Sequence, residues 1–218
     1  MKVLNKFVST DPHRAVLQKV KWCMDMLAAT DGRCLVMRKR QPDDENFEEY
    51  TGLKKFINMQ ANETKFNVQK LNNELLKHKT EQLMTTPPDC SVCGGDGFVM
   101  WEYKDYQNEF DCPGCNGNGL EGRPRPTGEK VISRRSNVMF GKMAVGGEYL
   151  RRLLDGCTEF SCGVIEEEHC IAGKFINENK LYHFVLMQVR LDGHDLKPIF
   201  HAGDFILSAD QEATEVKS

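Results

Sequence analysis

The spacing of apolar side chains divides the chain into three stretches with different patterns. In the first stretch, apolar residues at positions 3, 4, 7 and 8 have helical spacing and predict a short helix that ends before Pro12. Apolar residues that alternate with polar ones then predict strands over 14–23, 26–29 and 34–37. Asp31-Gly32 lies between the last two strands, and this pair is typical of a tight hairpin turn.

The second stretch, residues 46–86, is polar and its pattern predicts helices rather than strands. Its apolar residues recur at helical spacing, and they are Leu53, Phe56, Ile57, Phe66, Leu71, Leu75, Leu76 and Leu83. Pro87-Pro88 ends the stretch, because proline neither continues a helix nor leaves its preceding residue helical. Farther on, residues 98–103 predict a strand, with Phe110 on the returning strand of a hairpin.

The third stretch returns to the strand-rich pattern of the first. It predicts a strand over 131–140, an amphipathic helix over 146–154, and strands over 158–166, 169–175 and 181–191. The last of these strands is almost continuously apolar, which is typical of a strand buried on both faces. Residues 208–218 are rich in acidic and small residues, and we expect a disordered acidic tail there.

Composition places the chain among soluble proteins. Of its 218 residues 40% are hydrophobic and 28% are charged, as in ordinary globular domains. Apolar runs stay well short of the ~20 residues that cross a bilayer, and the N-terminal segment is too short and polar for a signal peptide. The odd count of nine cysteines favours free thiols in the reducing cytoplasm over paired disulfides.

Four of these cysteines form two matching blocks, Cys90-Ser-Val-Cys93-Gly-Gly-Asp-Gly97 and Cys112-Pro-Gly-Cys115-Asn-Gly-Asn-Gly119. Two residues between cysteines let both thiolates of a pair reach one tetrahedral ion, and the glycines permit the tight turns that aim backbone amides at the sulfurs. Four thiolates fill the coordination shell, so the pattern predicts one structural Zn²⁺ without an open catalytic position. A disulfide or a redox C-x-x-C are the alternatives, although neither needs two blocks with matching glycines.

The repeated C-x-x-C-x-G-x-G block resembles the cysteine-rich zinc region of DnaJ-type co-chaperones. The resemblance is limited to about residues 88–121, and the His-Pro-Asp tripeptide of a J-domain does not occur in the chain. It implies a small β-hairpin zinc module without the part that stimulates an ATPase.

A basic segment follows the second block of cysteines. Its positive residues are Arg123, Arg125, Lys130, Arg134, Arg135 and Lys142, against Glu121 and Glu129. Arginine suits phosphate because its planar fork donates two parallel hydrogen bonds, whereas the net charge of −3 gives no overall attraction to nucleic acid. Local DNA binding and ordinary solvated linker charge are both open interpretations of this segment.

Without the middle, the two ends of the chain resemble one domain of a bacterial DNA sliding clamp, of the DNA polymerase III beta type. The matching motifs are Asp11-Pro-His-Arg14, Ala29-Thr-Asp-Gly-Arg33, Tyr149-Leu-Arg-Arg-Leu-Leu154 and Val185-Leu-Met-Gln-Val-Arg-Leu191. The family's hairpin usually continues histidine-arginine after the glycine, but here Arg33 follows Gly32 directly. The resemblance covers residues 1–41 and 130–191.

The resemblance implies an α+β fold in which an antiparallel sheet carries two helices. We expect a discontinuous clamp-like domain over 1–41 and 130–207, interrupted by a helical insertion at 46–86 and the zinc module at 88–121. Arg151 and Arg152 lie on the predicted second helix, where a clamp presents basic residues to duplex DNA. Because one such domain cannot encircle DNA, the resemblance also implies a homo-oligomer formed by pairing of edge strands.

Catalysis has little support in the sequence. The histidines lack neighbours at triad or metal-protease spacing, and no phosphate-cradling G-x-x-x-x-G-K-[ST] occurs. We interpret Asp31 as a turn residue and Asp11 with Arg14 as an ion pair in a loop. The first hypothesis is thus a non-enzymatic clamp-like protein of DNA replication or repair that contacts DNA or replication proteins. The alternatives are a protein–protein adaptor and a chaperone-like peptide binder, none with an evident small-molecule substrate or membrane contact.

Overall fold

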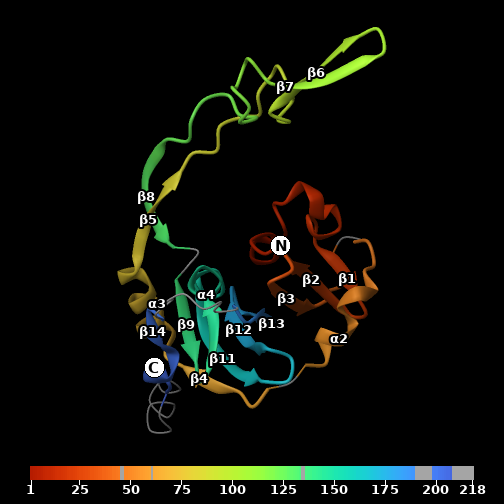
Figure 1. Cartoon of the computed structure of the whole chain (residues 1–218). Coiled ribbons are helices and arrows are strands. Elements are labelled where there is room, and N and C mark those ends of the chain that lie inside the picture. The colour runs from red at the N-terminus through yellow and green to blue at the C-terminus, as the bar shows by residue number, and fades with distance from the viewer. Residues whose placement is uncertain (45–46, 60, 134–135, 190–197, 208–218) are drawn as a thin grey trace. The chain divides into compact units, whose positions relative to one another are not determined.

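The computed structural model divides the chain into two compact units (Figure 1). The first unit comprises Met1–Lys79 and Ile132–Ser218, and the second comprises Thr80–Val131. The structure describes residues 1–44, 47–59, 61–133, 136–189 and 198–207. No helix within those ranges is long and apolar enough to span a membrane.

The first unit is built on a seven-stranded antiparallel sheet. Along the sheet the strands are β1 (Lys21–Cys23), β2 (Met26–Thr30), β3 (Cys34–Lys39), β13 (Lys180–Met187), β12 (Cys170–Asn177), β11 (Cys157–Ile165) and β4 (Thr64–Phe66). Because β13 pairs with β3, the last part of the chain completes a sheet that the first part begins.

Both faces of this sheet are buried, because side chains of alternating residues belong to two different apolar clusters. On one face, Val36 and Phe184 pack with helices α3 (Val68–Lys77) and α4 (Gly147–Leu154). On the other face, Leu35 and Val185 pack beneath a 3₁₀ helix over Thr51–Leu53 and helix α2 (Lys54–Ile57). The apolar run of β13 therefore has the two-sided burial that its composition predicted.

Smaller elements complete the first unit around the helical face. Helix α1 (Lys2–Asn5) contributes Val3 and Leu4 to the main core. Strands β10 (Met143–Gly146), β9 (Asn137–Phe140) and β14 (Phe200–His201) form a three-stranded sheet beside them. The remaining helical turns are 3₁₀ helices over Pro12–Leu17 and Ala202–Phe205.

Segments outside the sheet occupy its two outer edges. At β1, the Trp22 N–H donates to the carbonyl of Glu48 at 2.9 Å, and the Tyr50 N–H donates to the carbonyl of Trp22 at 2.7 Å. At β4, the Leu207 N–H donates to the carbonyl of Lys65 at 3.0 Å. Since an edge strand recruits another chain through unpaired backbone groups, these segments hinder the edge pairing that the clamp resemblance implied.

The second unit holds two separate two-stranded sheets (Figure 1). Strand β5 (Lys79–Met84), which begins at the last residue of the first unit, pairs with β8 (Pro126–Ile132). Strand β6 (Phe98–Tyr103) pairs with β7 (Tyr106–Asp111) as an antiparallel hairpin between the two cysteine blocks. The hairpin predicted from residues 98–103 and Phe110 is therefore confirmed.

Two predictions about secondary structure differ from the structure, and others lie outside the residues that it describes. Residues 14–23 do not form one strand, because the Asp11 carboxylate accepts the His13 N–H at 2.9 Å and starts a 3₁₀ helix that leaves only Lys21–Cys23 extended. The predicted strand over 131–140 is divided between β8 and β9. The tail at 208–218, residues 134–135 and the end of the strand predicted over 181–191 lie outside the described residues.

The predicted helical insertion at 46–86 is also wrong as a separate segment. Residues up to Lys79 belong to the first unit, and only α2, α3 and a 3₁₀ turn of this stretch are helical. The physical reason is burial: Phe66, Leu71 and Leu75 are almost fully buried in the core shared with the sheet. Helix α3 thus packs beside α4 on one face of the sheet.

Candidate metal centre

The four cysteines of the two blocks come together at the base of the β6–β7 hairpin. The Cys90 and Cys112 Sγ atoms lie 3.8 Å apart, as do the Sγ atoms of Cys93 and Cys115. All four sulfurs lie within 4.8 Å of one another. Zinc–sulfur bonds of about 2.3 Å in a tetrahedron place the sulfurs about 3.8 Å apart, so this donor set fits one tetrahedral ion.

Backbone amides point at the sulfurs, as the glycine spacing predicted. The Gly97 N–H donates to Cys93 Sγ at 3.3 Å, and the Gly119 N–H donates to Cys115 Sγ at 3.2 Å. Burial raises the pKa of Cys93, but hydrogen bonds from the N–H groups of Gly97 and Gly95 and from Cys112 and Cys115 together lower it to about 7. Amides that favour the thiolate are the usual outer shell of a metal-binding cysteine.

Two glycines are required because the two blocks approach each other closely. Gly97 and Gly119 have φ angles of +83° and +76°. A Cβ on Gly97 would lie 2.6 Å from the carbonyl oxygen of Gly117, and a Cβ on Gly119 would lie 2.3 Å from that of Gly95. Only glycine fits both the backbone angle and the contact, so the repeated glycines are explained by the geometry of the cluster.

Hydrogen bonds also cross between the blocks. The Cys112 N–H donates to the carbonyl of Gly97 at 2.9 Å, and the Cys90 N–H donates to the carbonyl of Gly119 at 2.8 Å. The two blocks therefore hold each other in register around the sulfurs. Four thiolates around an ion leave no position for water or substrate, and the chemistry of such a centre is structural.

The other cysteines are free thiols in the structure, which agrees with the prediction. Burial raises the pKa values of Cys34 and Cys162, and raises that of Cys157 to about 12, so these groups pack as neutral side chains. His169 and Cys170 are adjacent residues with side chains that can bind a metal, but within the described ranges they are not part of a group of three or more such side chains.

Three of the clamp-like motifs meet at Asp31. Its side chain accepts the N–H groups of Arg33 and Cys34 at 2.9 and 3.1 Å, as expected for a turn residue. Arg14, which pairs with the Asp11 carboxylate at 3.5 Å, donates from Nη1 to the Asp31 carbonyl at 2.9 Å. On α4, Arg152 Nη1 lies 3.9 Å from the Asp31 carboxylate.

The neighbouring Tyr149 is also affected, because burial and then the Asp31 charge raise its pKa to about 12. Motifs more than a hundred residues apart in the sequence are therefore parts of one cluster.

Beside this cluster is a hollow of about 200 Å³, which the sequence did not predict. The residues that line it include Leu17, Leu35, Leu53, Phe56, Val185 and Met187.

The residues predicted to contact DNA differ in their exposure and in their ion pairs. Arg123, Arg125 and Lys130 are exposed in the second unit. Arg151 and Arg152 are partly buried on α4 and already lie near the carboxylates of Asp155 (3.6 Å) and Asp31. The remaining two, Arg134 and Arg135, lie outside the described residues.

No protein-family model matches the chain. No curated protein matches it either. Solved structures do match, with low sequence identity. The sliding clamp of Bacillus subtilis is 12% identical with a TM-score of 0.46, and the match covers 87% of this chain and 60% of the clamp.

DNA polymerase III subunit beta of Borrelia burgdorferi is 13% identical with a TM-score of 0.46, and that match covers 87% of this chain and 61% of the subunit. The clamp of Pseudomonas aeruginosa is 10% identical with a TM-score of 0.43, over 87% of this chain and 64% of the clamp. The chain thus spans about three fifths of the clamps that it matches. By structural comparison, it is similar to bacterial sliding clamps of the DNA polymerase III beta type.

Proposed function

We propose that this chain is a non-enzymatic, zinc-binding scaffold of DNA replication or repair, with a sliding-clamp-like first unit and a zinc module at residues 88–121. It acts in the cytoplasm by contacting DNA and replication proteins. The observation that carries the proposal is the meeting of three clamp-like motifs at Asp31. The apolar hollow beside that cluster has room for an apolar side chain of a replication protein.

The metal that we propose is one structural Zn²⁺, with Cys90, Cys93, Cys112 and Cys115 as its ligands. The sulfur separations of 3.8 Å support this assignment, as does the all-thiolate donor set. The bound ion would fix the base of the β6–β7 hairpin. Neither the proposed site nor the proposed role includes a chemical reaction.

We expect the chain to be a monomer in solution, because the edges of its seven-stranded sheet are covered by residues 48–50 and 206–207. In excess zinc, sedimentation should give a mass near 24.9 kDa without DNA, and the mass of one chain plus one duplex when a short DNA duplex is added. A ring-sized oligomer that forms on DNA would contradict this expectation. In the monomer, DNA would be held by surface contacts rather than by encirclement.

The DNA contact is tested by removing the exposed positive charges of the second unit. We expect the combined variant Arg123→Gln, Arg125→Gln and Lys130→Gln to bind duplex DNA more weakly, with a shallower dependence of affinity on salt. Each lost phosphate contact should reduce the slope of log K against log salt by about 0.9. Fluorescence anisotropy of a labelled duplex at several salt concentrations measures both changes.

A matched control removes the same number of charges from the first unit, with Lys2→Gln, Lys19→Gln and Lys70→Gln, all three exposed. If the two variants have the same slope, DNA binding is a general charge effect and the basic segment has no special part in it. Wild-type protein that does not bind the duplex would refute the DNA part of the proposal.

A protein–protein adaptor is the second candidate function. It is favoured by one specific observation, the exposure of several aromatic side chains on the β6–β7 hairpin. Under this alternative the zinc module presents a protein-binding surface, and DNA is not required.

A further inference from the structure

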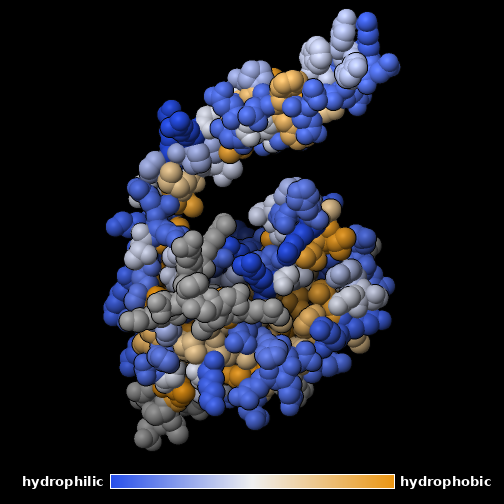
Figure 2. Space-filling model, in the orientation of Figure 1, coloured by the Kyte–Doolittle hydropathy of each residue, from blue (hydrophilic) through white to orange (hydrophobic). Residues whose placement is uncertain are grey.

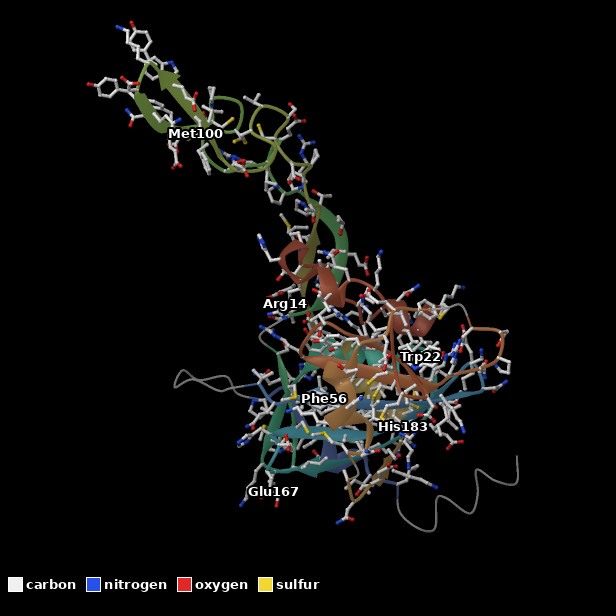
Figure 3. All side chains as sticks on the ribbon, turned by 90° about the vertical axis from the view of Figure 1, so that its right-hand side faces the viewer. Arg14, Trp22, Phe56, Met100, Glu167 and His183 are labelled. Carbon is white, nitrogen blue, oxygen red and sulfur yellow. The ribbon has the colours of Figure 1, made fainter. Side chains whose placement is uncertain are left out.

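The β6–β7 hairpin has two chemically different faces. Residues that pair across an antiparallel hairpin project on the same side, and the side alternates along each strand. The register pairs Trp101 with Asn108 and Tyr103 with Tyr106, so one face is aromatic and consists of Val99, Trp101, Tyr103, Tyr106, Asn108 and Phe110. The opposite face consists of Phe98, Met100, Glu102, Gln107, Glu109 and Asp111 (Figure 3, where Met100 is labelled).

The aromatic face is exposed. The exposed fractions are 52% for Trp101, 56% for Tyr103, 73% for Tyr106 and 54% for Phe110. Trp101 and Tyr103 stack on each other, with ring centroids 5.7 Å apart. Figure 2 shows pale and blue atoms side by side at the tip of the hairpin, so the hairpin has no strongly hydrophobic patch at that end in this view. A gathering of exposed aromatic side chains, unlike a single one, indicates an interaction surface.

Charge narrows the choice of partner. Between Phe98 and Asp111 the hairpin carries four carboxylates and one lysine, a net charge of −3. This charge disfavours a phosphate backbone, although aromatic side chains alone could stack on bases. Arginine fits both features, because its guanidinium stacks on aromatic rings and pairs with carboxylates.

The hairpin also offers backbone pairing. Within the described residues it is a sheet of only two strands, so β6 and β7 each have one edge without a strand beside it. An extended peptide can add to such an edge as a further strand. Its alternate side chains would then lie in turn beside the aromatic face and beside the opposite face, which carries the carboxylates of Glu102, Glu109 and Asp111.

We propose that the β6–β7 hairpin binds an extended segment of a partner protein in which apolar and arginine residues alternate, as a third strand. This inference deepens the proposed scaffold function, because it names the chemistry of a protein partner. It rests on that function in one respect, since the proposed zinc ion holds the base of the hairpin. It does not depend on DNA binding, which the salt experiment tests separately.

The test uses full-length, zinc-loaded protein and a labelled peptide in which valine and arginine alternate. A peptide of the same composition, with all valines before all arginines, is the sequence control. We expect the alternating peptide to bind the wild type, and to bind at least about tenfold more weakly when Trp101→Ala and Tyr106→Ala are combined. The combined variant Glu102→Gln and Glu109→Gln should also weaken binding, with a smaller salt dependence.

Leu83→Ala, which alters an exposed apolar residue on β5, is the matched variant and should bind as the wild type does. Zinc content, measured for every variant, separates loss of the surface from loss of the module. The proposal is overturned if the block peptide binds equally well, since that result indicates chaperone-like capture of any apolar chain. It is also overturned if single-stranded oligothymidine binds through Trp101 and Tyr106, or if the alternating peptide does not bind the wild type.

Discussion

Replacing Cys112 with Ser is expected to abolish stoichiometric zinc binding and to unfold residues 88–121, while the seven-stranded sheet stays folded. A serine hydroxyl does not replace a thiolate in a four-sulfur site, so the ion loses a quarter of its ligands. Structural zinc contributes about 10–16 kcal/mol to the folding of small zinc modules. This is the largest effect that we expect from a single substitution in the chain.

The module has little else to hold it together. Its buried side chains are those of Cys90, Cys112 and Cys115, with Cys93 and Val99 packed against them. An apolar core this small does not offset the conformational entropy of ordering the segment, so the metal must supply the difference. The first unit has its own core and a separate set of internal contacts, and it should therefore survive the loss.

Zinc per chain is measured by atomic emission, and local order by hydrogen exchange of residues 88–121. The matched control is Cys157→Ser, because Cys157 lies outside the cluster and its Sγ donates a hydrogen bond to the Glu159 carbonyl that a hydroxyl can replace. This variant should keep one zinc. Full zinc binding by the Cys112→Ser protein would refute the four-ligand assignment, and global unfolding would show that the two units do not fold separately.

The sequence predicted the cysteine cluster well because its signals are local. Each block is determined within eight residues, by two cysteines that are two residues apart and by glycines at fixed positions after them. The structure adds only that Gly97 and Gly119 contact the opposite block. The hairpin between the blocks follows from the same local pattern. Which side chains share a face of that hairpin, and which are exposed, depends on the pairing register of its two strands. The sequence alone does not determine that register.

The fold was harder to predict where tertiary contacts decide the structure. Val16 suggested a strand, but it is 51% exposed and lies in a 3₁₀ helix that Arg14 holds against the Asp31 turn. Likewise, the polar composition of residues 46–86 concealed that Leu71 and Leu75 belong to the main core. The clamp-like motifs were recognised singly, but their meeting at Asp31 depends on strand pairing between distant segments.

A buried ion pair provides the second large expected effect. The side chains of Arg38 and Asp44 are 4% and 8% exposed and form two hydrogen bonds with each other, one of them 2.8 Å from Nη1 to Oδ2. Asp44 also accepts the Gln41 N–H at 2.7 Å, and so ties the loop after β3 to that strand. The hydrogen bonds from Arg38 lower the pKa of Asp44 from 3.8 to about 2.

We expect Asp44→Asn to cost about 3–5 kcal/mol of unfolding free energy at pH 7, because the Arg38 guanidinium stays buried without its counter-charge. A carboxyl whose pKa is lower in the folded state stabilises fully above its unfolded pKa, near 3.8, and loses that contribution as the pH falls toward 2. The difference between wild type and variant should therefore shrink across this range in urea unfolding. Asp43→Asn, at the exposed neighbouring position, should cost little at either pH. An Asp44→Asn variant as stable as the wild type at pH 7 would show that the pair contributes no net stability, because its desolvation then cancels its attraction.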